Sequence, residues 1–210
     1  MGAVVKQTKI HLELAAALRQ FRAAVSLHSH TLHSQETFSF IHRLTARFRL
    51  VRSAVERGKA QYRAAHGSSL DLHRAWWTPP LAAYDAWLLE RNEIQNRFGL
   101  NALVSLTDHD NIEGALGLRL LEECRRLPVS VEWTVPYGPT FFHLGIHNLP
   151  PSRAQELMGE LKSLTEARRT RKIASLLQTL ADGKETLIVF NHPCWDENNI
   201  GQEQHRPRTA

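Results

Sequence analysis

Residues 102–110 read ALVSLTDHD, an apolar run that ends in two carboxylates flanking an imidazole. A short apolar run bounded by polar residues predicts a buried β-strand. Outward from this run, further short apolar runs alternate with stretches of helical periodicity. The expected strands cover residues 24–27, 102–107, 129–131, 140–146 and 186–190, and the expected helices cover residues 8–24, 36–65, 81–97, 113–126 and 152–180. This alternation predicts an α/β domain built around a mainly parallel sheet or barrel.

Four of these strands end, toward the C-terminus, in side chains that can bind metal. In chain order, these side chains are His28 and His30, then Asp108, His109 and Asp110, then Glu132, and finally Asn191 and His192. In parallel α/β folds the C-terminal ends of the strands open onto one face. We therefore expect the four groups to converge in a metal site.

The first two strand ends carry the motifs His28-Ser29-His30 and Asp108-His109-Asp110. An extended backbone sends residues i and i+2 to the same side, so the two imidazoles of the first motif can hold one ion. In the second motif, the imidazole between carboxylates suits direct ligation or orientation of a ligating histidine. Helix capping by Asp110 and Asn111 is the alternative, and both roles are compatible.

The later candidates lie on apolar strands. Glu132 ends one of them, where an ionised carboxylate is costly unless it meets a metal or another charge, so an arginine salt bridge is the alternative to ligation. His143 and His147 are four residues apart and face the same way on a strand, so strand alternation does not choose between them. His192 lies at a strand exit, next to a proline that ends the strand.

Taken in order, these motifs resemble the series of the PHP family, named for polymerase and histidinol phosphatase. The series is SLHSHT (residues 26–31), SLTDHD (105–110), the strand-end Glu132, FHLG (142–145) and NHP (191–193). The resemblance spans roughly residues 24–196 and implies a distorted (β/α)7-type barrel with a long helical insertion after the first strand. It also implies hydrolysis of phosphomonoesters or phosphodiesters by two or three divalent ions, such as zinc, manganese, iron or magnesium.

The same resemblance implies which residues hold the first two ions. His28 and His30 match the positions that bind the first ion, and Glu132 matches the carboxylate that bridges it to the second. His143 and His192 would complete the second site. The resemblance therefore implies a centre rich in imidazole around one shared glutamate.

A third ion would take His109 as a ligand. The family usually adds a ligand a few residues after the His-x-His pair, and here His33 and Glu36 are the nearby candidates, with Glu36 ahead on spacing. Asp108, His109 and His192 are the residues that we expect to act in catalysis. The choice between His33 and Glu36 stays open.

The chain departs from the family pattern in two places. Ser26 stands where the family commonly has an aspartate that orients a ligating histidine. No late strand with an Asp-x-His element follows the NHP motif, so we expect a barrel that is incomplete at its C-terminal end. A non-enzymatic, metal-binding remnant is one alternative function. An amidohydrolase-like metal hydrolase is another, although no predicted strand ends in the bridging lysine typical of that class.

Length and composition fit one domain over residues 1–210. Its 42% hydrophobic content supports a sizeable core, and it divides into an N-terminal helix (1–23), a helical insertion (37–98) and a polar tail (201–210). Two isolated cysteines, Cys124 and Cys194, fit a reducing compartment. The charged N-terminal stretch matches neither a signal peptide nor a membrane span, so we expect a cytoplasmic protein without a membrane partner.

The formal net charge of +5 comes largely from arginines scattered along the predicted helices. Such runs are usually solvated helix faces, and their summed field would also favour the approach of anionic substrates. Together with the PHP resemblance, this implies a phosphorylated small molecule or a nucleic-acid end as the substrate. The helical insertion is a candidate cover for that substrate. A helical decoration packed on the domain is the alternative.

Overall fold

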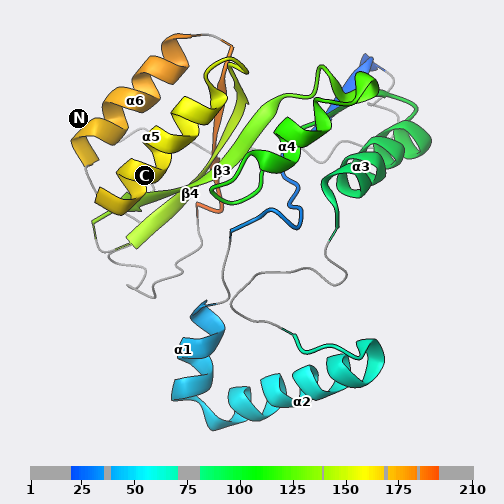
Figure 1. The fold of residues 1–210 in the computed structure, drawn as a ribbon, viewed down its shortest axis with the longest axis vertical. Helices are drawn as coiled ribbons and strands as arrows, with labels where there is room; N and C mark the ends of the chain where they lie inside the picture. The colour runs from blue at the N-terminus through cyan, green and yellow to red at the C-terminus, as the bar shows by residue number, and fades with distance from the viewer. Residues whose placement is uncertain are drawn as a thin grey trace, which may run out of the picture.

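The computed structural model describes residues 20–35, 39–70, 81–138, 140–167, 170–183 and 185–193 (Figure 1). The predicted ligand Glu36, residues 1–19 of the expected N-terminal helix, and the tail (201–210) lie outside the described residues. Within the described ranges, no helix is long and apolar enough to cross a lipid bilayer.

Two small sheets form the β-structure. β1 (Ala23–Ser26) pairs in parallel with β2 (Asn101–Val104), and β3 (Val129–Tyr137) pairs antiparallel with β4 (Thr140–Leu149), which pairs antiparallel with β5 (Leu187–Asn191). An isolated parallel bridge between His109 and Glu132 links the chain after β2 to β3. The two sheets therefore meet at the residues that the sequence singled out.

The expected (β/α)7-type barrel is wrong. The described residues form a two-stranded parallel sheet and a three-stranded antiparallel sheet, and no barrel closes. The reason lies between β3 and β4, where Tyr137 pairs with Thr140 and only residues 138–139 connect the strands. A parallel neighbour needs a crossover of about a dozen residues or more, whereas so short a connection makes a hairpin.

The alternation of β3 gives its two faces different roles. Val129, Val131, Trp133 and Val135 are buried in the larger core. Ser130, Glu132 and Thr134 point to the opposite face, because successive strand residues alternate sides. Polar side chains are therefore set on one face of a strand whose other face is held by apolar packing.

Helices α5 (Ala154–Ala167) and α6 (Thr170–Asp182) pack against the apolar face of β3, where a single helix over residues 152–180 was expected. The buried positions Leu157, Met158, Leu161 and Leu164 follow the three- and four-residue steps of an amphipathic helix. The Trp133 indole donates hydrogen bonds to the Thr165 hydroxyl (2.8 Å) and the Leu161 carbonyl (3.2 Å). These contacts hold β3, and with it Glu132, in place.

A second core lies beside β2. Helix α3 (Ala83–Phe98), helix α4 (Glu113–Leu118) and the 3-10 helix η2 (Glu122–Cys124) pack there around Val104, Leu106 and Trp87. α4 and η2 replace the single helix expected over residues 113–126. The part of the predicted insertion that forms α3 is thus packed into the fold.

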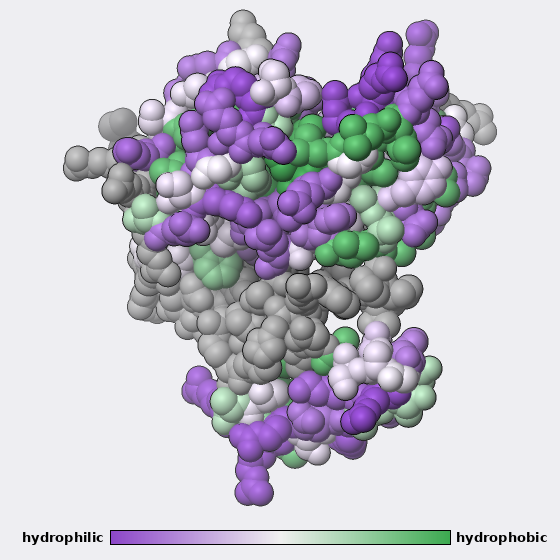
Figure 2. Space-filling model, viewed as in Figure 1, coloured by the Kyte–Doolittle hydropathy of each residue, from purple (hydrophilic) through white to green (hydrophobic). Residues whose placement is uncertain are grey.

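Helices α1 (Ser39–Arg47) and α2 (Arg49–His66) project away from the strands (Figure 1). α2 has no buried residue, and Figure 2 shows mostly hydrophilic side chains over this pair of helices. Gly67 (φ 69°) and Gly99 (φ 66°) end α2 and α3 in the left-handed conformation that glycine adopts without strain, at the helix ends that the sequence predicted.

Candidate metal centre

Five predicted histidine ligands meet around the carboxylate of a sixth predicted ligand, Glu132. His28 and His30 follow β1, His109 follows β2, Glu132 and His143 lie within β3 and β4, and His192 follows β5. The Glu132 Oε2 atom lies 3.6 Å from His28 Nε2, 3.3 Å from His30 Nε2 and 3.5 Å from His109 Nε2. The Glu132 Oε1 atom lies 3.7 Å from His143 Nδ1 and 3.6 Å from His192 Nε2. Both carboxylate oxygens are therefore surrounded by imidazole nitrogens.

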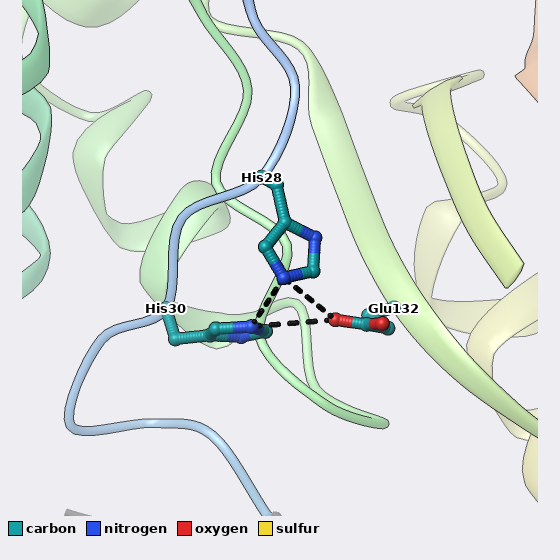
Figure 3. A group of neighbouring side chains, drawn as sticks. All are labelled: His28, His30 and Glu132. Carbon is teal, nitrogen blue, oxygen red and sulfur yellow. Dashed lines mark hydrogen bonds and ion pairs between the residues drawn. The ribbon is translucent and has the colours of Figure 1, made fainter. Parts of the chain in front are cut away.

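These side chains form two groups with the spacing of metal ligands. In the first, His28, His30 and Glu132 point toward one another (Figure 3). The second consists of His109, Glu132 and His143, and in each group the donor atoms all lie within 4.8 Å of one another. Glu132 belongs to both groups.

The register of the antiparallel sheet explains why Glu132 can reach its neighbours. Glu132 lies opposite Gly145 on β4, and Thr134 lies opposite His143. A Cβ atom on Gly145 would lie 3.2 Å from Asn191 Nδ2, so the glycine leaves room for the Asn191 amide, which donates from Nδ2 to Glu132 Oε1 (3.1 Å). Sequence reasoning placed Asn191 at the strand end but missed its contact with the glutamate.

Burial keeps several of the imidazoles neutral. Desolvation, followed by the nearby histidines, lowers the pKa of His30 and His143 to about 4 and that of His109 to about 2. Desolvation and His192 also lower the pKa of His28. Neutral imidazole is the form that binds metal, so these histidines are ready to bind ions at pH 7 without losing a proton.

The donor set fits divalent ions. Glu132 is fully buried, and burying an ionised carboxylate is costly unless charge or hydrogen bonds compensate it. Imidazole and carboxylate together suit zinc, manganese and iron. The structure therefore contains His/Glu groups that could bind a metal ion.

Asp108, a predicted catalytic residue, is in neither ligand group. It is buried, and its carboxylate accepts hydrogen bonds from the Thr31 backbone N–H and from Thr31 Oγ1 (2.8 Å). Burial raises the pKa of Asp108, and the Thr31 hydrogen bonds oppose that shift. Asp108 thus ties the chain just after His30 to the chain just after β2.

Asp110 does not cap a helix, which was the alternative role for it; it joins two segments of chain, as Asp108 does. Its backbone has a positive φ of 49°, its N–H donates to the Glu132 carbonyl (3.0 Å), and its carboxylate accepts from the Thr134 N–H (2.9 Å). The N-cap position of α4 is Ile112, and Asn111, one residue before it, accepts a hydrogen bond from the Glu113 N–H through its Oδ1 atom (2.7 Å). Asp110 therefore fixes β3 beside His109.

Replacing Asp108 with asparagine is expected to weaken ion binding by about 10-fold or more, in the range typical of residues that orient ligands. One of the two Thr31 donors would then face an amide N–H, which cannot accept it, so we expect a cost of about 1–3 kcal/mol in the free energy of unfolding. Ion titration and urea denaturation measure the two effects. Asp85→Asn, at an exposed site on α3, is the matched control. Unchanged ion affinity in Asp108→Asn would contradict this role.

Two further histidines lie outside the ligand groups. His33, the alternative to Glu36, lies with its Nδ1 atom 3.9 Å from Glu113 Oε2. His147, which alternation could not separate from His143, is buried and contacts Ser105 through its Nδ1 atom (2.8 Å). The structure thus selects His143 as the member of the pair that faces Glu132.

The description of the candidate metal centre rests on the positions of its side chains. The PHP resemblance rests on the order of the motifs in the sequence, and it stays a hypothesis about this chain. No protein-family model, no curated protein and no solved structure matches the chain.

Proposed function

We propose that this chain is a metal-dependent phosphoesterase in which two divalent ions share the Glu132 carboxylate. The observation that carries the proposal is the pair of ligand groups that overlap at Glu132. A carboxylate shared by two ligand sets can bridge two ions a few ångströms apart, and paired ions at that spacing recur in enzymes that cleave phosphoesters. The order of the PHP-like motifs supports the same activity.

The first ion would be held by His28, His30 and Glu132. The second would be held by His109, Glu132 and His143, with His192 close enough to Glu132 to complete the set. Three protein ligands leave coordination positions open, as catalytic rather than structural zinc sites do. An imidazole-rich set favours zinc, manganese or iron over magnesium.

Paired divalent ions supply a lowered pKa for bound water and electrostatic stabilisation of the phosphoryl oxygens. The exposure of the surrounding histidines indicates from which side a substrate would reach the ions. His30 and His109 form the closed side of the centre, with 10% and 5% of their side chains exposed, whereas His28 and His192 are 38% and 49% exposed. A phosphate group would therefore approach past His28 and His192.

The charge of the chain supports an anionic substrate. The net charge is +5, and the exposed helix α2 carries Arg49, Arg52, Arg57 and Arg63. A positive field raises the local concentration of phosphorylated molecules. The proposed substrate class is therefore a phosphomonoester or phosphodiester, from a small molecule or a nucleic-acid end.

The test begins with protein freed of metal by a chelator. We expect titration with Zn²⁺ or Mn²⁺ to show two ions bound, and metal-dependent hydrolysis of p-nitrophenyl phosphate or bis-p-nitrophenyl phosphate. His143→Gln should lose this activity, while His66→Gln, at an exposed site on α2, should keep it. Protein that binds ions but hydrolyses neither ester would refute the enzymatic proposal and leave a metal-binding protein.

A further inference from the structure

Helix α2 carries a stripe of basic side chains along one face. Arg49, Arg52, Lys59 and Arg63 follow one another at steps of three, seven and four residues. Because an α-helix completes a turn in about 3.6 residues, these steps return to the same side, and the four residues span about 21 Å of the helix axis. The three arginines are exposed, and 33% of the Lys59 side chain is exposed. These four residues are called the basic stripe below.

Little negative charge within the fold neutralises the basic stripe. Lys59 pairs with Glu56 (3.2 Å), which lies on the same side of the helix. Among the residues that the structure describes, none makes an ion pair with Arg49, Arg52 or Arg63. Arg52 instead donates a hydrogen bond to the Thr45 carbonyl (2.9 Å), which leaves its positive charge uncompensated. Three positive charges on this face are therefore available to an anionic partner.

The basic stripe is not arranged to stabilise the helix that bears it. Arg49 and Arg52 occupy the first turn, which holds no acidic residue, although the helix dipole favours negative charge there. Arg49 and Arg52 are three residues apart, Lys59 and Arg63 are four residues apart, and like charges at such spacings repel. A solvated helix is usually held by many pairs of opposite charge, whereas the described contacts of α2 include one such pair and no buried residue. An anionic partner would offset the repulsion.

Double-stranded nucleic acid has the charge and the shape that the basic stripe fits. A duplex carries one negative charge per about 1.7 Å of its axis, so a straight helix face of about 21 Å can lie along a dense row of phosphates. Arginine and lysine contact phosphates without regard to base sequence. The basic stripe contains no aromatic side chain, whereas proteins that bind single strands stack the bases on aromatic residues. A duplex backbone therefore fits better than a single strand.

A lipid surface fits α2 less well. A helix that lies in a membrane interface presents a broad apolar face rich in tryptophan, phenylalanine or leucine, in addition to its basic residues. On α2 the side chains of Val51, Val55 and Tyr62 are only partly exposed, and Leu50 is the one large apolar side chain of this helix that is mostly exposed. Figure 2 likewise shows mostly hydrophilic side chains over α1 and α2. The basic face therefore has no matching apolar face to insert into lipid.

We propose that the basic stripe of α2 binds the phosphate backbone of double-stranded nucleic acid without reading its sequence. No residue of the basic stripe belongs to the two ligand groups that share Glu132, and the binding needs no metal ion. The inference therefore goes beyond the proposed phosphoesterase activity and does not rest on it. It assigns an anionic partner to the pair of helices that projects away from the strands (Figure 1).

The test uses the full chain in the presence of EDTA, so that no ester is cleaved, and a fluorescent DNA duplex of arbitrary sequence. Fluorescence anisotropy at salt concentrations between about 50 and 200 mM gives the Kd and its salt dependence. We expect Arg49→Gln and Arg63→Gln each to weaken binding by about 3–10-fold at the lowest salt concentration. Each should also reduce the slope of log Kd against log salt concentration by about 1, because one phosphate contact is lost.

Two substitutions on the same helix separate the basic stripe from net charge. Arg57→Gln removes the same charge, but Arg57 lies about 120° around the helix from the centre of the basic stripe, so its Kd is expected to stay within about 2-fold of the wild type. Glu56→Gln removes the acidic residue that pairs with Lys59, so binding is expected to become about 3-fold tighter. Circular dichroism checks that each variant keeps its helix content.

Three results would overturn the proposal. If Arg57→Gln weakens binding as much as Arg63→Gln, only net charge matters and the basic stripe is not a binding surface. The absence of any gain in Glu56→Gln would mean the same. Tighter binding to a single strand of equal length, or to phosphatidylserine vesicles, than to the duplex would assign the helix another partner. Duplex binding by a protein that hydrolyses no phosphoester would refute the proposed function and leave this inference intact.

Discussion

Replacing Glu132 with glutamine is expected to abolish ion binding by both ligand groups at once. Glu132 belongs to both groups, and each of its oxygens faces imidazole nitrogens. An amide keeps the shape of the side chain but has no charge and offers one acceptor instead of two. We expect the affinity of both sites for Zn²⁺ or Mn²⁺ to fall by at least about 100-fold. Removing a residue that only orients a ligand costs up to about 100-fold, and Glu132 is itself a proposed ligand. Titration of metal-free protein, followed by calorimetry, measures the loss.

The same substitution should not destabilise the metal-free protein. Glu132 is fully buried, and a neutral amide costs less to bury than an ionised carboxylate. The free energy of unfolding is therefore expected to stay constant or rise while ion binding disappears. Glu166→Gln, at an exposed site on α5, should change neither quantity. Loss of only one of the two ions in Glu132→Gln would show that the carboxylate does not bridge.

The convergence of the ligands was predictable because it depends on strand direction. β1 and β2 run parallel, and His28, His30 and His109 follow their C-terminal ends as predicted. β5 is antiparallel to β4, as β3 is, so β3 and β5 run the same way and His192 follows the end of β5. The strand that departs from the expected pattern is β4, whose direction is reversed by the hairpin.

The position of His143 could not be obtained from strand ends. It lies on the reversed strand β4, and it reaches the centre because the register sets it opposite Thr134, two residues beyond Glu132. Register depends on the side chains that pack on both faces and on the hairpin, which periodicity within one strand does not contain. The separation of His143 from His147 therefore needed the structure, as did the glycine that lets Asn191 reach Glu132.

The prediction of a barrel was wrong, and the sequence already contained the evidence against it. No stretch with helical periodicity separates the expected strands at residues 129–131 and 140–146, so a crossover helix had no residues to form it. The helix-cap role considered for Asp110 was wrong for a different reason. Helix-cap preference describes a residue next to a helix, whereas the backbone of Asp110 turns to a positive φ and its side chain binds β3. Tertiary contact thus overrode local preference.

Acid is expected to destabilise the metal-free protein steeply between pH 6.5 and 4. In the folded state the pKa of His30, His143 and His147 is lowered to about 4, chiefly by desolvation, and that of His109 to about 2. In the unfolded chain these histidines take up protons near pH 6.5, so in this window the unfolded state binds more protons and stability falls as the pH falls. Each of the four is expected to cost of the order of 1–2 kcal/mol between pH 6.5 and 5. Urea denaturation at a series of pH values measures the slope.

The carboxylates that surround the centre act in the opposite direction, and the histidines are expected to outweigh them. Burial raises the pKa of Asp108 and Asp110, so these two groups take up protons more readily in the folded state and favour folding as the pH falls. His109→Gln removes the most strongly shifted histidine and should reduce the proton uptake on unfolding by nearly one proton at pH 5. His66→Gln, a matched change at an exposed site on α2, is the control for the substitution itself. A free energy of unfolding that stays constant from pH 7 to 5 would mean that these imidazoles take up protons in the folded state as readily as in the unfolded chain. Burial would then not lower their pKa, so this result would count against a closed, desolvated metal centre as well.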